Sequence, residues 1–180
     1  MRILLIDNGS SLLKKLQQLI PGSEITKVFD SVKLSDVNDY DLIVLSGGGH
    51  HNVIFEREKF LEEIRIIRSG KPIIGICFGC ELIANAFDGE LEELPSEQKG
   101  IYKIEILDEV LGPKTMQVYE GHKWYISKLP EGFEVLAISD RGPEIIKHKT
   151  LPIYGLQFHP ENMVNETGGD ELFLNLLSCF

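Results

Sequence analysis

Short apolar runs alternate with amphipathic segments along the first half of the chain. Runs rich in Ile, Leu and Val predict buried strands over residues 2–7, 24–29, 41–46 and 72–76. Between them, apolar residues at helical spacing predict helices over residues 12–20, 56–69 and 79–87. Ser10 or Ser11 is expected to cap the first helix, and Pro21-Gly22 to end it. This alternation predicts a parallel sheet with helices on both faces.

The pattern changes in the second half. Shorter strand candidates with turns between them cover residues 101–107, 115–119, 133–139 and 144–148. A final apolar strand is predicted over 152–158 and a closing helix over 168–177, while the polar stretch 88–100 is expected to be a surface loop. We therefore expect one α/β domain over residues 1–180: an open, mostly parallel sheet with helices on both faces and added antiparallel strands in the second half.

Composition narrows the possible partners and compartments. The 180 residues are 43 % hydrophobic and 26 % charged, as in an ordinary globular protein. A net charge of −10 argues against a nucleic-acid partner, whose phosphates it would repel. The start lacks the features of a signal peptide, and no apolar run has the length of a membrane span. With three cysteines, an odd number, we expect a reducing, cytoplasmic location.

A candidate nucleophile lies in the sequence Gly-Ile-Cys-Phe-Gly at residues 75–79. Cys77 stands where a strand ends and a helix begins, and glycines flank it because a sharp turn there leaves no space for side chains. The N-terminus of a helix favours a thiolate. The backbone N–H of Phe78 is placed to donate to an oxyanion. Taken alone, a lone cysteine is more often a buried structural residue.

A second signal follows the last predicted strand, in Gln-Phe-His-Pro-Glu at residues 157–161. Active sites of open α/β sheets lie outside the carboxyl ends of the strands, and both Cys77 and His159 stand at such ends. His159 is placed to take the proton of the thiol, and Glu161 to fix the tautomer of the imidazole. Each of these two residues alone would be read as an ordinary polar residue.

A glycine run supplies the third signal. Ser46-Gly47-Gly48 follows a predicted strand, where backbone without side chains can approach a ligand closely. Gly48 is a candidate second oxyanion donor. Alone this signal is weak, since glycine runs also form ordinary turns.

Together these motifs resemble the class I, or triad, glutamine amidotransferases. That family shows a G-x-C-x-G turn, a downstream H-P-E and an upstream S-G-G loop, in the order found here. The resemblance extends over essentially the whole chain and implies a flavodoxin-like sheet. Within the family, the start at residues 5–9 and the segment 151–161 are similar to the stand-alone archaeal-type amidotransferase subunit of GMP synthetase.

The resemblance implies hydrolysis of glutamine through a thioester on Cys77, with His159 and Glu161 completing the triad. It implies an oxyanion site at Gly48 and Phe78, and substrate contacts by Gly47 and Glu81. It places His122 on a region facing a synthetase partner, which would be the ATP-pyrophosphatase subunit if the product is GMP. No cofactor and no metal are implied. Cys80, three residues after the nucleophile, is expected to be a small core residue.

The chain departs from the family pattern at several positions. Glu81 stands where the family has a glutamine that helps to hold the substrate; an ionised carboxylate accepts hydrogen bonds but donates none, and it would repel a substrate carboxylate. Lys123 and Trp124 follow His122 at the positions where the family pattern has an acid. Residues 8–11 and 49–51 also differ from the family pattern. Two alternatives therefore stay open: a free-standing γ-glutamyl hydrolase with the same triad, and a non-catalytic regulatory relic.

Overall fold

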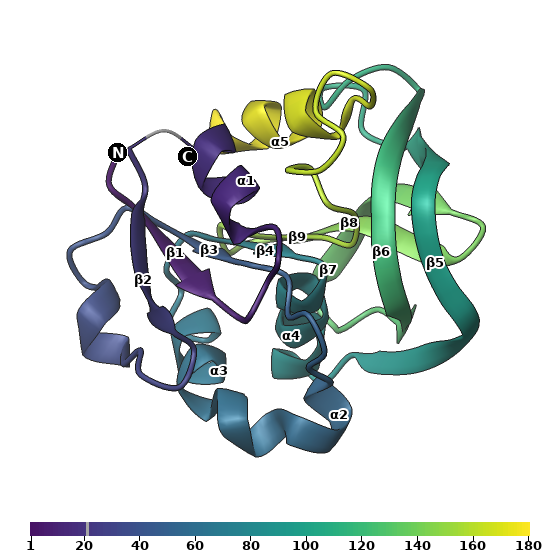
Figure 1. Cartoon of the computed structure of the whole chain (residues 1–180). Helices are drawn as coiled ribbons and strands as arrows, with labels where there is room; N and C mark the ends of the chain where they lie inside the picture. Colours follow the sequence, from purple (N-terminus) through teal and green to yellow (C-terminus); the bar gives the residue numbers. More distant parts are fainter. Residues whose placement is uncertain (21) are drawn as a thin grey trace.

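A single nine-stranded sheet forms the centre of the computed structural model, which describes residues 1–20 and 22–180 (Figure 1). The strand order is β2-β1-β3-β4-β9-β8-β7-β5-β6. The five strands from β2 to β9 run parallel. Their bounds are β1 Ile3–Asp7, β2 Glu24–Val28, β3 Leu42–Leu45, β4 Ile73–Ile76 and β9 Ile153–Leu156. The predicted parallel core is therefore confirmed, with the 2-1-3-4 order of flavodoxin-like sheets.

Helices cover both faces of the parallel strands (Figure 1). One face carries α1 (Leu13–Leu19) and α5 (Gly169–Leu177), whose apolar side chains pack with Leu5 and Ile74. The other face carries α3 (Leu61–Ile67) and α4 (Phe78–Ala86), which pack with Leu4 and Ile43. Successive residues of β1 thus point to opposite cores, as strand geometry requires. The 3₁₀ segment η1 spans Leu34–Val37.

The antiparallel half differs from the expectation in the length of its strands. Its bounds are β5 Glu90–Ile106, β6 Thr115–Lys128, β7 Phe133–Ser139 and β8 Gly142–His148. The loop predicted over residues 88–100 is wrong, because β5 begins at Glu90 and pairs with β6 almost throughout. Leu94 and Gln98 are buried between exposed neighbours. The strand was missed because most side chains over residues 88–100 are polar and face solvent, which gives no apolar strand pattern.

The helix predicted over residues 56–69 is also wrong as a single element. The segment is α2 (Val53–Glu56), a 3₁₀ turn η2 (Arg57–Phe60) and then α3. It starts three residues earlier because the side chain of Asn52 accepts hydrogen bonds from the backbone N–H groups of Ile54 and Phe55. No serine caps α1, which begins after Leu12; Ser10 Oγ instead accepts from Leu12 N–H at 3.1 Å.

Two remaining expectations concern the first helix and membranes. The role expected of Pro21 in ending α1 falls outside the described residues, while α1 itself ends at Leu19. Among the described residues, no helix combines the length and the apolar character that crossing a membrane requires.

Candidate active site

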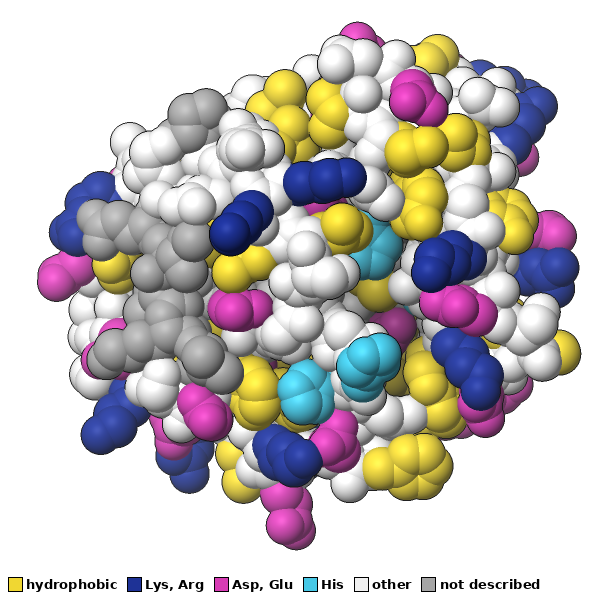
Figure 2. Space-filling view, in the orientation of Figure 1, with side chains coloured by type: hydrophobic (Ala, Val, Ile, Leu, Met, Phe, Trp, Pro, Cys, Tyr) yellow, Lys and Arg dark blue, Asp and Glu magenta, His cyan; other side chains and the backbone are white. Residues whose placement is uncertain are grey.

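A pocket of about 1050 Å³ opens at the carboxyl ends of the parallel strands. Loops after β1 and β3, the start of α4, the strand β6 and the segment after β9 line it. Histidine side chains gather around this hollow on the face shown in Figure 2. The position is the one where open α/β sheets bind their ligands. All three motifs found in the sequence therefore meet at this edge of the sheet.

Cys77 occupies the turn between β4 and α4 in a strained backbone conformation, with φ 50° and ψ −107°. Its N–H donates to the carbonyl of Leu156 at 2.7 Å, which fixes it beside the end of β9. A Cβ at Gly75 would lie 2.4 Å from the carbonyl oxygen of Gly79, and one at Gly79 would lie 2.6 Å from that of Leu45. Only glycine fits at either position, so the turn that presents the thiol depends on both.

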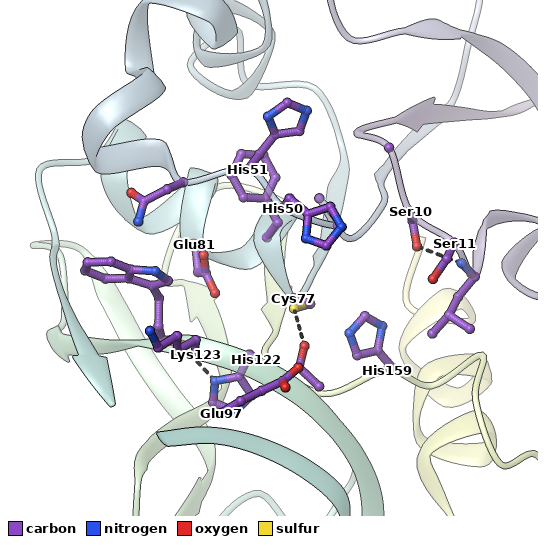
Figure 3. A pocket seen from close by; sticks show the side chains of 18 of the residues that line it. Ser10, Ser11, His50, His51, Cys77, Glu81, Glu97, His122, Lys123 and His159 are labelled. Carbon is purple, nitrogen blue, oxygen red and sulfur yellow. Dashed lines mark hydrogen bonds between the residues drawn. The ribbon is translucent and has the colours of Figure 1, made fainter. Parts of the chain in front are cut away.

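His159 and Glu161 form a buried pair next to the thiol. Nδ1 of His159 lies 2.9 Å from Oε1 of Glu161, and both side chains are almost fully buried. The backbone N–H of His159 donates to the carbonyl of Tyr119 at 2.8 Å, which anchors this segment to β6. A carboxylate can only accept, so Nδ1 carries the hydrogen and Nε2 is left to take a proton from Cys77. Figure 3 shows Cys77 and His159 facing the same pocket.

The electrostatic environment couples the thiol to the imidazole. Burial raises the pKa of the Cys77 thiol, and the neighbouring His159 partly offsets this. Burial disfavours the charged form of His159, but contact with Cys77 and Glu161 outweighs it and holds the pKa of the imidazole well above its usual range. The pair is therefore suited to hold a thiolate beside an imidazolium, the reactive form of a cysteine nucleophile.

The S-G-G loop lies against both members of this pair. A Cβ at Gly47 would stand 3.0 Å from Cε1 of His159 and 3.8 Å from Cβ of Cys77, so Gly47 packs behind them and gives them clearance. Gly48 packs on the ring of Phe78, and both residues line the pocket. Phe78 opens α4, and the first N–H of a helix has no acceptor within the helix. Backbone at Gly48 and Phe78 thus reaches the pocket beside Cys77.

Glu81 lies one helical turn after Cys77, on the wall of the same pocket (Figure 3). Its side chain is buried, and Oε1 accepts a hydrogen bond from Nε2 of Gln157 at 3.2 Å. Burial raises the pKa of this carboxyl to about 7, against an opposing effect of Gln157. Near neutral pH, a large share of Glu81 is consequently an uncharged acid with a hydrogen to donate.

His122 lines the pocket, although its side chain is almost fully buried. Its side chain is 1 % exposed, and Nδ1 lies 2.7 Å from the carbonyl oxygen of Trp124. Nε2 lies 3.2 Å from the carboxylate of Glu120, which is also buried. β6 continues through this residue and turns its side chain to the pocket wall, and the role expected of His122 in facing a partner stays a prediction. Trp124 reaches the pocket rim, 6.1 Å from the ring of the exposed Phe55.

Two further buried acids near this region were not found from the sequence. Glu144 is 1 % exposed, and burial together with Glu120 raises its pKa well above the usual range. Burial raises the pKa of Glu120 itself to about 7. The spacing of Glu120 and His122, two residues apart on a strand, was a visible sign that both side chains share one face. No signal in the sequence indicated that Glu144 would lie opposite them.

Cys80 and His51 have neighbours that explain their positions. The sulfur of Cys80 is buried and would lie 2.6 Å from a Cβ at Gly155, so this residue packs in the core as expected. Nδ1 of His51 lies 3.0 Å from Oε2 of Glu56. His50 and His51 line the outer part of the pocket.

Comparisons with known proteins agree on one family. The family model described as glutamine amidotransferase class-I matches residues 4–179. Over 179 residues the chain is 35 % identical to a subunit of the glutamine-hydrolysing GMP synthase of Pyrococcus furiosus, covering 94 % of each chain. The corresponding subunit from Pyrococcus abyssi is also 35 % identical, with 94 % of each chain covered. A crystal structure of a candidate GMP synthase subunit from Thermoplasma acidophilum is similar, with a TM-score of 0.87 and 28 % identity over 99 % of this chain and 92 % of that one.

Proposed function

The chain belongs to the class I glutamine amidotransferase family, and from this premise we propose that Cys77, His159 and Glu161 hydrolyse glutamine to glutamate and ammonia. The observation that carries the proposal is the arrangement of Cys77, strained at φ 50° on its turn, beside a histidine whose far nitrogen lies 2.9 Å from a buried carboxylate. This is the geometry of an activated nucleophile with an oriented base.

In the first half of the reaction the thiolate of Cys77 attacks the γ-carbonyl carbon of glutamine. A C–S bond forms, and the carbonyl electrons move to an oxygen that accepts hydrogen bonds from the backbone N–H groups of Gly48 and Phe78. The C–N bond then breaks as His159, carrying the proton taken from the thiol, donates it to the leaving nitrogen. Ammonia departs and a γ-glutamyl thioester remains on Cys77.

In the second half water attacks the thioester. Nε2 of His159 accepts a proton from the water as the C–O bond forms, and the proton passes to the sulfur as the C–S bond breaks. Glutamate leaves and the resting thiol–imidazole pair is restored. Glu161 keeps the hydrogen on Nδ1 throughout, so that Nε2 alone exchanges protons.

We further propose that the ammonia passes to a separate synthetase, the ATP-pyrophosphatase subunit of GMP synthetase. Similarity to GMP synthase subunits over almost the whole length of both chains supports this assignment. We also propose that residues 1–180 form one glutaminase domain, which the single sheet and the family match over 4–179 support. A reducing, cytoplasmic location suits its thiol nucleophile.

One observation favours a second candidate, a free-standing γ-glutamyl hydrolase. Glu81 places a carboxyl group where the family has an amide, and an ionised Glu81 suits a substrate with an amine at that position. An uncharged Glu81, however, donates one hydrogen bond and accepts another, as the amide does. Since burial holds the pKa of Glu81 at about 7, glutamine remains the substrate that we propose.

A glutamine-like chloroketone or diazoketone, read by mass spectrometry, tests the proposal. We expect labelling at Cys77 that glutamine suppresses, and faster labelling when an ATP-pyrophosphatase subunit of GMP synthetase is added. Cys77→Ala should abolish the label, whereas Cys179→Ala, at an exposed and remote thiol, should not. Labelling that glutamine fails to suppress would favour the hydrolase with another γ-glutamyl substrate. An unlabelled Cys77 in the presence of the partner subunit would contradict catalysis altogether.

A further inference from the structure

Three buried side chains lie together at the pocket wall: His122, which lines the pocket, Glu120 on the same strand β6, and Glu144 on β8. One ligand atom from each lies within 4.8 Å of the others. The three residues are between 0 % and 5 % exposed. None of them serves as nucleophile, base or oxyanion donor in the reaction described above. The cluster therefore needs its own explanation.

The hydrogen bonding of His122 directs one ring nitrogen into this cluster. Nδ1 lies 2.7 Å from the carbonyl oxygen of Trp124, and a carbonyl can only accept, so Nδ1 carries a hydrogen. Nε2 then faces the carboxyl groups. It lies 3.2 Å from Oε2 of Glu120, yet among the described residues it has no hydrogen-bond partner. A buried imidazole nitrogen with its lone pair turned inward is the arrangement of a metal ligand.

The carboxyl oxygens of the cluster mostly face one another. Among the described residues, the oxygens of Glu120 and Oε2 of Glu144 have no partner outside the cluster, while Oε1 of Glu144 accepts a hydrogen bond from Ser139 at 2.7 Å. Buried polar atoms in native proteins are almost always satisfied, and buried carboxylates are paired or coordinate a metal. The ligand atoms of the three residues therefore contact only one another, and one atom from each lies within 4.8 Å of the other two.

We propose that Glu120, His122 and Glu144 bind one divalent transition-metal ion, Zn²⁺ or Mn²⁺. Two carboxylates and one neutral imidazole are a donor set that both ions accept. Bonds of about 2.0–2.2 Å to a shared ion require ligand atoms about 3–4 Å apart, which small rotations of these side chains reach. The hydrogen bond from Nδ1 to Trp124 acts as the outer contact that orients a metal-bound histidine.

The ion would join two strands that position the active site. The carbonyl of Glu144 accepts a hydrogen bond from the N–H of Gln157 at 2.9 Å, and the residue before Glu120, Tyr119, accepts one from the N–H of His159 at 2.8 Å. Both β6 and β8 therefore hold the segment that carries the catalytic histidine. An ion between them stabilises this support and takes no part in the chemistry at Cys77.

Metal binding to chelator-treated protein tests the site directly. Equilibrium dialysis with Zn²⁺ or Mn²⁺, followed by elemental analysis, should give one ion per chain. Glu144→Gln should weaken binding by at least about 100-fold, because the loss of even an outer-shell partner costs 10–100-fold. The matched control is Glu134→Gln, which removes an exposed carboxylate on the neighbouring strand β7 and should leave binding unchanged.

Two further readouts separate this site from adventitious binding. Co²⁺ bound here should show no sulfur-to-metal charge-transfer absorption, since the ligands are oxygen and nitrogen. The metal should raise the melting temperature of wild-type protein but not that of Glu144→Gln. Without metal, Glu144→Gln should have a higher melting temperature than wild type, because the variant removes one of two facing carboxyls.

Several results would overturn the proposal. They are absence of a bound ion, equal binding by wild type and Glu144→Gln, or a metal-independent melting temperature. If Glu144→Gln fails to fold, Glu120→Gln provides the same comparison. Absence of a bound ion would mean that the acids share protons instead.

Discussion

At the scale of single residues, Glu81 is the side chain on which the behaviour of the pocket depends most. It is buried on the pocket wall, accepts from Gln157 at 3.2 Å and has a pKa of about 7. Below this pH it resembles the glutamine of the family, with one donor and one acceptor. Above it the ionised group repels the α-carboxylate of glutamine and can no longer donate.

We expect the kcat/KM of Glu81→Gln for glutamine to exceed that of wild type increasingly as the pH rises. At pH 6 the two proteins should have similar kcat/KM for glutamine. Above pH 7, wild type should lose activity relative to the variant by up to about tenfold per pH unit, since only the uncharged acid binds well. Ionised Glu81 also raises the pKa of the Cys77 thiol, so its removal in the variant favours the thiolate and acts in the same direction.

The measurement is the ratio of kcat/KM between variant and wild type from pH 6 to 9, with the partner subunit present. Glu93→Gln, at an exposed carboxylate on the pocket rim, is the control and should give a constant ratio. A constant ratio for Glu81→Gln as well would show that the charge of Glu81 has no effect on glutamine.

At the scale of elements, the turn between β4 and α4 depends on backbone contacts that exclude side chains. Gly75 on the strand meets Gly79 on the helix so closely that any Cβ would lie 2.4 Å from a backbone oxygen. The close contact lets the helix start directly at the strand end and leaves Cys77 at φ 50°. The nucleophile is thus positioned by the contact between two elements.

Gly75→Ala should therefore damage stability and activity together. Overpacking of this kind typically costs about 1–3 kcal/mol, and a displaced turn would also move the thiol. Urea denaturation and the rate of Cys77 labelling measure the two effects. The control is Gly169→Ala at the start of α5, where a Cβ meets ordinary contacts at 3.4 Å or more, and stability should be unchanged or slightly higher. A normal rate of Cys77 labelling in Gly75→Ala would contradict the claim that this close contact positions the thiol.

At the scale of the whole molecule, several buried acids have raised pKa values. Glu63 on α3 is 0 % exposed, and burial raises its pKa to about 8, against an opposing effect of the Asn8 side chain. Burial also raises the pKa of Glu81 and Glu120 to about 7. Between the unfolded pKa of 4.5 and these values, the folded chain holds more protons than the unfolded chain. Stability must then fall as the pH rises through this window.

We expect the free energy of unfolding to decrease from pH 5 to pH 8. One pKa unit corresponds to about 1.4 kcal/mol, so Glu63 alone accounts for a loss of roughly 3–5 kcal/mol. Glu63→Gln should reduce this slope, because the amide has no proton to lose. Its neighbour Glu62, which pairs with Arg65 at the surface, provides the control. Glu62→Gln should change the free energy of unfolding by less than about 1 kcal/mol and leave its slope with pH unchanged. Urea titrations across the pH range measure both; an unchanged slope in Glu63→Gln would contradict the prediction.

Local patterns in the sequence were sufficient for the parallel half of the fold and for the triad. Apolar runs give strands because buried strands need apolar side chains on both faces, and these runs identified β1, β3, β4 and β9. The carboxyl ends of such strands meet at one edge of the sheet, so Cys77 and His159 were expected together although far apart in the chain. The glycines around Cys77 revealed the turn because a close backbone contact leaves no space for a Cβ, and only glycine lacks one.

Tertiary structure decided the features that depend on which side of a strand faces the core. The polar start of β5 has no apolar signal of its own, and it is a strand because it pairs with β6. That pairing turns His122 inward and brings Glu120 opposite Glu144. Burial then sets the protonation of these acids and of Glu81. Sequence spacing determines which residues can share a face, but only the assembled sheet determines whether that face meets water.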